Sequence, residues 1–360
     1  MKARLTAGTL TLALFAAAIA FAFVVVRYGS TPTSVRLEHV SSIVYSAKQN
    51  AIFASTVKNL DGLDKHVVVY RLNADTLKIE GQISLDADYG LGIALSPDES
   101  LIAIGTMDST ILASTSNLSV VKIDPPLPGS ALMGFAPDGK LVLCDSTGLF
   151  TFDVNAQKRS EPIAFKRNDT ASSAFSSKAN LMAAIDGMYK ITTQADQLFA
   201  LPFAHTPLDL GRQIHLFDGT TMKESSTLHL DGSTGCAFSP DGNYLAVVGN
   251  YDVTAGAYSA NRLTLWNVPQ NVLVWSVVLD VSSDRQRYGI ISDVAFLGAN
   301  LICANGSGDL LAIDLKTGRK LWTKRSGTEG MWAVSGGLAV SKDGKHVYTR
   351  SMNQVIKYDL

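Results

Sequence analysis

A hairpin pattern, in which two short apolar runs flank a polar turn, recurs along this chain of 360 residues. The clearest copy runs from Ala237 to Asn250 and reads AFSPDGNYLAVVGN. Six more copies, three close and three degenerate, begin at Tyr45, Leu95, Phe135, Phe175, Phe296 and Val340. Their spacing clusters near roughly 40–50 residues, the period of a repeated four-stranded unit, with two longer intervals. A chain with such a period folds as an array of similar small sheets.

A second pattern, an apolar strand that ends in Asp or Asn, follows most of these copies. It occurs at Phe152-Asp153, Phe217-Asp218, Trp266-Asn267, Ile313-Asp314 and Tyr358-Asp359. A polar turn and a fourth strand come next, as in the sequence KTGRKLW. Each unit therefore predicts strand a, a tight turn, strand b, a loop, strand c, a turn and strand d.

The seventh unit has no fourth strand, because the sequence stops at Leu360. Residues 34–40, SVRLEHV, have strand character and precede the first strand a. If they supply the missing strand, the ring closes by hydrogen bonding and no exposed edge is left in an incomplete blade. We therefore predict an all-β, seven-bladed β-propeller of four-stranded antiparallel blades over residues 34–360.

These motifs resemble those of the WD-repeat and bacterial seven-bladed β-propeller families. The resemblance covers residues 34–360 and rests on the S-P-D-G turns and the strand ends, of which Trp266-Asn267 is nearest to a Trp-Asp pair. No Gly-His pair recurs before strand a, and this departs from true WD repeats. The resemblance implies a ring-shaped fold, which alone does not choose between a binding protein and an enzyme.

The N-terminal residues 7–26 carry no charge and form a run as long as the ~20 apolar residues that span a bilayer. A basic start, residues 1–6, precedes this run, and a linker, residues 27–33, follows it. One interpretation is a signal peptide cleaved at Ala20-Phe21-Ala22. The other, which we favour because the apolar run continues to Val26, is an uncleaved signal anchor that forms a transmembrane helix. Both place the propeller outside the cytoplasm, in a periplasmic or extracellular space. It is held at the membrane in one case and secreted in the other.

Charge and cysteine content exclude several classes of function. The net charge of -1 gives no electrostatic basis for binding nucleic acid, which needs a basic patch or stripe. The three cysteines each lie in an apolar, strand-like run without a C-x-x-C spacing, so we expect buried free thiols. No nucleophile elbow, phosphate loop, dinucleotide fingerprint or H-E-x-x-H motif occurs in the sequence.

The aspartates of the turns, Asp98, Asp138, Asp241 and Asp343, have a sufficient structural role. Pro sets φ at the second position of such a turn, Asp suits the third, and Gly accepts the left-handed conformation that follows. The four carboxylates belong to separate blades, so we expect no shared metal. His215 and His229 fall on adjacent strands of one blade, where a contact is expected to be a packing or surface feature.

Loop lengths indicate where function is concentrated. Long segments follow strand b in three units, over Val57–Lys65, Gly187–Arg212 and Asn250–Asn261. In a propeller these b–c loops share one face with the d–a loops. We predict a binding face there that is made of Asp88, Tyr89, Asp169, Asp231, Tyr251, Tyr258, Arg285, Arg287, Tyr288, Glu329 and Trp332. No catalytic residue, resident metal or cofactor is assigned, although the acidic residues of this face suit a divalent cation such as calcium.

Two hypotheses of function follow. The first is a non-catalytic, membrane-anchored scaffold that binds a protein partner through the loop face. The alternative is an extracytoplasmic propeller enzyme, similar to lactonases or dehydrogenase subunits, with an acidic metal site at the channel mouth. The absence of a converging set of His and Glu residues favours the scaffold.

Overall fold

The computed structural model of the protein describes residues 32–360, apart from thirteen internal segments. These segments are residues 59–65, 88–89, 107–108, 124–125, 129–130, 146–147, 164–172, 186–212, 230–232, 250–260, 280–290, 306–307 and 327–336. The expected basic start, anchor and most of the linker lie outside the described residues. Among the residues that are described, no helix is long and apolar enough to cross a membrane.

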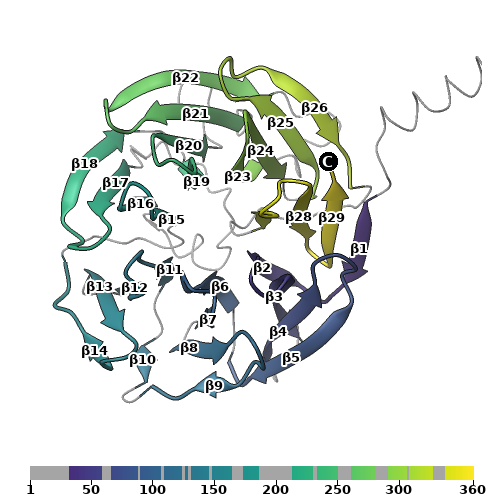
Figure 1. The fold of residues 1–360 in the computed structure, drawn as a ribbon, viewed down its shortest axis with the longest axis vertical. Coiled ribbons are helices and arrows are strands. Elements are labelled where there is room, and N and C mark those ends of the chain that lie inside the picture. The colour runs from purple at the N-terminus through teal and green to yellow at the C-terminus, as the bar shows by residue number, and fades with distance from the viewer. Residues whose placement is uncertain are drawn as a thin grey trace, which may run out of the picture.

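Seven antiparallel sheets stand around a central axis, which confirms the predicted all-β seven-bladed propeller (Figure 1). The first strands of successive blades contact one another around the ring, so they form its inner wall. These inner strands are β2 (Val40–Ser46), β6 (Gly90–Leu95), β11 (Ala131–Phe135), β15 (Ser173–Ser176), β19 (Ser233–Phe238), β23 (Ile291–Leu297) and β27 (Leu338–Val340).

Strands b and c form the middle of each blade. The b strands are β3 (Ala51–Lys58), β7 (Leu101–Thr106), β12 (Leu141–Asp145), β16 (Leu181–Ile185), β20 (Tyr244–Gly249), β24 (Asn300–Asn305) and β28 (His346–Ser351). The c strands are β4 (His66–Asn73), β8 (Ser109–Ser114), β13 (Gly148–Asp153), β17 (Gln213–Asp218), β21 (Asn261–Asn267), β25 (Leu310–Asp314) and β29 (Gln354–Asp359).

The outer strands form the rim of the ring. They are β5 (Ile79–Leu85), β9 (Val120–Val121) with β10 (Leu127–Pro128), β14 (Lys158–Arg159), β18 (Glu224–His229), β22 (Val272–Leu279), β26 (Lys320–Lys324) and β1 (Thr33–Arg36). In blades one, four, five and six the pairing of strands c and d shifts by one residue near the turn. This bulge adds twist to the outer edge of those blades.

The ring closes where its two ends meet. β1 pairs with β29 in the same sheet as β28 and β27, with Thr33 opposite Lys357 and Arg36 opposite Gln354. The observed strand is shorter than the expected residues 34–40. The amide of Leu37 donates to the turn after β28 at Asn353, and Val40 already begins the first inner strand. The residues with strand character in the sequence therefore include a bend, residues 37–39, that carries the chain from the outer strand β1 to the inner strand β2.

The two faces of the ring differ in how the strands are joined. The a–b and c–d turns lie together on one face, because a backbone hydrogen bond joins them in six blades. These bonds are Ala74–Asn50, Thr115–Ser100, Gly219–Asn180, Val268–Asn243, Leu315–Ala299 and Leu360–Lys345. We call this the turn face. The b–c and d–a connections leave from the opposite side, the loop face.

Apolar clusters fill the seams between blades. One cluster joins Ile185 and Leu216 of blade four to Leu245 and Val247 of blade five. Another joins Leu263 of blade five to residues of blade six, including Leu301. Every blade thus buries its faces against two neighbours, which favours closure of the whole ring over a stable isolated blade.

Candidate functional site

The predicted binding face lies outside the described residues. This applies to all of its eleven members, Asp88, Tyr89, Asp169, Asp231, Tyr251, Tyr258, Arg285, Arg287, Tyr288, Glu329 and Trp332. The strands that carry these segments are described, and they place the segment ends. Residues 59–65, 186–212 and 250–260 each leave from the end of a b strand and return at the start of a c strand, on the loop face. The binding face stays a prediction, and the structure shows only the strand ends from which its b–c connections leave.

The turn carboxylates use their oxygens locally. In blade two, Asp98 Oδ1 accepts hydrogen bonds from the Ser96 hydroxyl at 2.6 Å and the Ser100 amide at 3.1 Å. The hydrogen bond from Ser96, followed by those from Ser100, lowers the pKa of Asp98 to about 2. Asp241 and Asp343 accept the same pattern of hydrogen bonds from Ser239 and Ser341 and also have lowered pKa values.

The strand-end aspartates cap the c–d turns. Asp218 Oδ1 accepts from the amides of Thr220 and Thr221 at 3.1 and 2.7 Å, and Asp314 Oδ1 accepts from the amide of Thr317 at 2.7 Å. Such Asx turns hold the chain where strand c reverses into strand d. The expected structural role of both aspartate sets is thus confirmed.

His215 contacts an acid on the adjacent strand. Its Nδ1 lies 2.9 Å from Glu224 Oε1, which also accepts from the Thr227 hydroxyl at 2.6 Å. The hydrogen bond from Thr227 and then that from His215 lower the pKa of Glu224. In the pairing of strands c and d, Thr227 rather than His229 stands opposite His215. This arrangement is a partly exposed hydrogen-bonded pair on the blade surface.

The three cysteines are free, as expected. Cys144 and Cys303 are buried, and Cys236 is half-buried on an inner strand. Burial raises the pKa of Cys236 to about 12, so the thiolate that nucleophilic or metal chemistry needs is scarce at neutral pH. These side chains act as small apolar groups in the seams.

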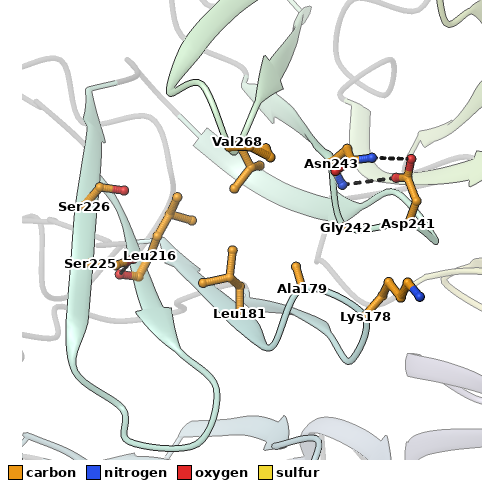
Figure 2. A pocket seen from close by; sticks show the side chains of 11 residues that line it. Lys178, Ala179, Leu181, Leu216, Ser225, Ser226, Asp241, Gly242, Asn243 and Val268 are labelled. Carbon is orange, nitrogen blue, oxygen red and sulfur yellow. Dashed lines mark hydrogen bonds between the residues drawn. The ribbon is translucent and has the colours of Figure 1, made fainter.

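A cavity of about 490 Å³ lies on the turn face at the seam between blades four and five (Figure 2). Leu181, Leu216 and Val268 stand around its centre, and Lys178 points away from them. The polar groups at the edge are largely engaged, because Asn243 donates to both oxygens of Asp241, from its amide at 3.1 Å and its side chain at 2.8 Å. The cavity offers an apolar floor and few free polar groups.

Small residues create this seam. Gly242 has φ +75°, and a Cβ placed on it would overlap Ala179 and come within 2.8 Å of Ser176 Oγ. The a–b turn of blade five therefore packs directly on the a–b turn of blade four. Sequence reasoning explained Gly242 by the turn alone and missed this contact, since the partner turn is degenerate and lies about one blade away in the sequence.

One buried charge lies where blades six, seven and one meet at the loop face. Arg350, 8% exposed, donates from Nη1 to the carbonyl of Val40 at 3.0 Å. Asp293 accepts from the amide of Gly337 at 3.1 Å, and its charge opposes the lowering of the Arg350 pKa that burial causes. These contacts tie the last inner strands to the first, so the group stabilises the closure of the ring.

The described part of the chain contains no group of three or more His, Cys, Asp or Glu side chains that could hold a metal ion. The acidic residues expected at the channel mouth lie outside that part, so the calcium-type site and the alternative enzyme remain predictions. No family model matches the chain. A search of curated proteins also finds no match.

Proposed function

We propose that the protein is a non-catalytic β-propeller scaffold, held outside the cytoplasm by residues 7–26, that binds a protein partner through its loop face. In this proposal it is a member of the WD-repeat-like or bacterial seven-bladed propellers. The role needs a rigid ring and variable connections on one side, and it needs no catalytic group.

One observation carries the proposal. The three longest interruptions between strands b and c all start and end on the loop face, whereas the a–b connections of all seven blades are tight turns. The residues that distinguish this protein from other propellers are therefore concentrated on the loop face, where a specific partner would bind. Tyr251 and Tyr258 in residues 250–260 belong to a residue type enriched in protein interfaces.

The chemistry of the turn face supports the same assignment. Its carboxylates accept hydrogen bonds from neighbouring hydroxyl and amide groups, and their pKa values fall as a result. A general base needs a pKa near the working pH, so these carboxylates are poor catalysts and good structural caps.

The test is partner recovery from native membranes with the full-length chain as bait. Replacing residues 251–259 with a short Gly-Ser linker should abolish recovery of a specific partner. As a matched control, replacing residues 155–157 in a turn-face connection of blade three with Gly-Asn-Gly should leave recovery unchanged. The midpoint of thermal unfolding of each variant verifies that the ring is intact. Equal recovery by the two variants would contradict the proposal.

The anchor has its own test. Alkaline carbonate should leave the full-length chain in the membrane pellet. An external protease acting on sealed inside-out membrane vesicles, whose lumen corresponds to the extracytoplasmic side, should not reach the propeller. Release of a shortened chain into the soluble fraction would instead identify residues 1–22 as a cleaved signal peptide.

A further inference from the structure

Two neighbouring outer strands expose apolar side chains at the rim. On β22, Val272, Leu273, Val274 and Val278 are 46%, 50%, 45% and 59% exposed, and on β26 Leu321 is 50% exposed. We call these five residues the rim patch. They are five of the eight large apolar side chains exposed in the described part of the chain, so exposed apolar surface is concentrated on two adjacent blades. Grouped apolar exposure of this kind marks an interaction surface.

The edge of β22 also lacks the usual protection against contact. Its eight residues include no charge and no proline. The other outer strands of comparable position carry Glu80 in β5, Glu224 in β18, Lys320 in β26 or Arg36 in β1, and those of blades two and three are only two residues long. Since charge and shortness are what normally protect a sheet edge, blade five stands out around the rim.

At the seam between blades five and six, β22 packs against the turn that leads into β26. Trp275 Nε1 donates to the carbonyl of Leu315 at 2.9 Å, and Gly318 rests on Val277 and Trp275. The turn that carries Leu315 and Gly318 also exposes Lys316 and Arg319. Lys320 is exposed where β26 begins, and Arg325 is exposed just after β26 ends. The one carboxylate of this turn, Asp314, is bound to Thr317. The patch is therefore apolar with a basic border.

The start of the described chain lies beside this border. Lys324 at the end of β26 donates to the carbonyl of Asp359 at 2.5 Å, and Lys357, two residues earlier, pairs with Thr33 in β1 (Figure 1). Only residues 27–32 separate Thr33 from the uncharged run that ends at Val26. Six extended residues span at most about 20 Å, so the linker allows the end of that run at Val26 to lie no farther than about this distance from the start of β1.

We propose that the rim of blades five and six lies on the surface of an anionic bilayer. The inference rests on the proposed membrane anchor and adds an orientation to it. Apolar side chains with a basic border match the boundary between acyl chains and negatively charged headgroups. The ring then stands edge-on, its axis runs parallel to the bilayer, and the loop face opens sideways toward proteins in the same membrane.

A second copy of the chain suits this surface less well. A twofold contact uses the same patch on both copies, so it would bring the cations around Leu321 of both copies into one interface. Like charges brought together weaken such an interface, whereas anionic lipid neutralises the same cations. The positive charge of the border thus favours an anionic lipid surface over a second copy of the chain as the occupant of the rim patch.

The experiment places the full-length chain in lipid nanodiscs, one copy per disc, with about 30% anionic lipid. A fluorescent label is attached at L273C in one variant and at K158C, on the outer strand of blade three, in the control. The unsubstituted chain gives the background from the native thiols. Lipids spin-labelled at the headgroup should quench the label at position 273 about twofold more than the label at position 158. In the L273C chain, Lys316→Gln with Arg319→Gln and Lys320→Gln should remove this difference.

Each outcome has a separate meaning. Equal quenching at positions 273 and 158 overturns the rim proposal while the anchor stands. A label at 273 that is shielded from a soluble quencher and unaffected by the lipid quencher indicates a protein occupant, and this also overturns it. Quenching that survives the triple substitution overturns the role of anionic lipid. A chain that does not enter the discs contradicts the anchor itself and is recognised before any label is read.

Discussion

The turn face and the loop face are made by the same strands, yet their connections follow different rules. On the turn face, short turns repeat a Ser–Asp or Asp–Thr hydrogen-bond pattern, and six blades also repeat a backbone bond between their two turns. On the loop face, the connections after strand b range from two residues in the hairpin turn at Met352-Asn353 to 27 residues in blade four. The same strands anchor the connections of both faces, so the difference in length and regularity belongs to the connections themselves.

This comparison separates residues kept for folding from residues free for recognition. A turn that packs on its neighbour tolerates little change, since an added atom meets the next blade. A connection that only rejoins two strand ends can lengthen at small entropic cost, because doubling a loop costs about 0.6 kcal/mol. Conspicuous motifs therefore indicate the fold here, and in the proposed function the irregular segments supply recognition.

The largest expected effect is at the seam between two turns. Gly242→Ala forces a side chain into φ +75° and against Ala179, so we expect a loss of about 3 kcal/mol in the free energy of unfolding. The matched control is Gly139→Ala, which has φ +85° and nothing within 4 Å of the new Cβ. It should cost about 1 kcal/mol. Urea unfolding measures both, and equal losses would mean that the seam contact contributes nothing.

The next effect is at a turn that lacks the usual glycine. Glu99 has φ +56° and accepts from the Ser46 hydroxyl at 2.7 Å and the Lys48 amide at 2.8 Å, which links blades one and two. Glu99→Ala should destabilise by about 1.5 kcal/mol, since both hydrogen bonds are lost. Glu99→Gly loses the same bonds but relaxes the backbone, so it should cost about 1 kcal/mol less. A Gly variant no more stable than the Ala variant in chemical denaturation would refute this account.

A smaller effect follows from the charge of a turn carboxylate. The folded pKa of Asp98 is lowered to about 2, so its charge stabilises the fold above the unfolded pKa of about 4. That stability is lost as the pH falls from about 4 through about 2. Asp98→Asn keeps an acceptor but no charge, and should cost about 1 kcal/mol at pH 7 after allowance for solvent screening. The difference between wild type and variant should shrink below pH 4 in unfolding curves, and a constant difference would exclude the charge as its source.

The smallest expected effect concerns the loop face. Replacing residues 251–259 with three Gly-Ser residues should change the free energy of unfolding by less than about 1 kcal/mol, because only loop-closure entropy changes. Differential scanning calorimetry at two scan rates measures this. A loss as large as that of Gly242→Ala would show that residues 251–259 belong to the folded core, and the contrast between the faces would fail.

The sequence was sufficient for the fold because its repeat encodes local structure. Each S-P-D-G turn and each strand-end Asp is explained by atoms within a few residues, as the contacts of Asp241 and Asp314 illustrate. The closing strand was placed correctly and its end was not, since apolar residues such as Leu37 continue through the bend. The seam contact of Gly242 could not be foreseen, because it depends on how two blades rotate against each other.

The candidate site was less predictable for a related reason. Loop residues such as Tyr251 and Arg285 have no periodic pattern that fixes their neighbours, so only their face can be deduced. The pairing of His215 with Glu224 follows a one-residue bulge that shifts the register between strands c and d. The sequence of a single blade gives no clear sign of such a bulge, although four blades share it.

The pairing of β1 with β29 also sets the order in which this protein matures. Thr33 and Lys357 lie far apart in the sequence, so this sheet cannot form until β29 has been synthesised. Until then blade seven consists of β27 and β28, and β1, although already made, has no strand to pair with. Synthesis of β29 (Gln354–Asp359) is therefore the step that allows the ring to close, and a chain without this strand would leave β1 with no strand to pair with.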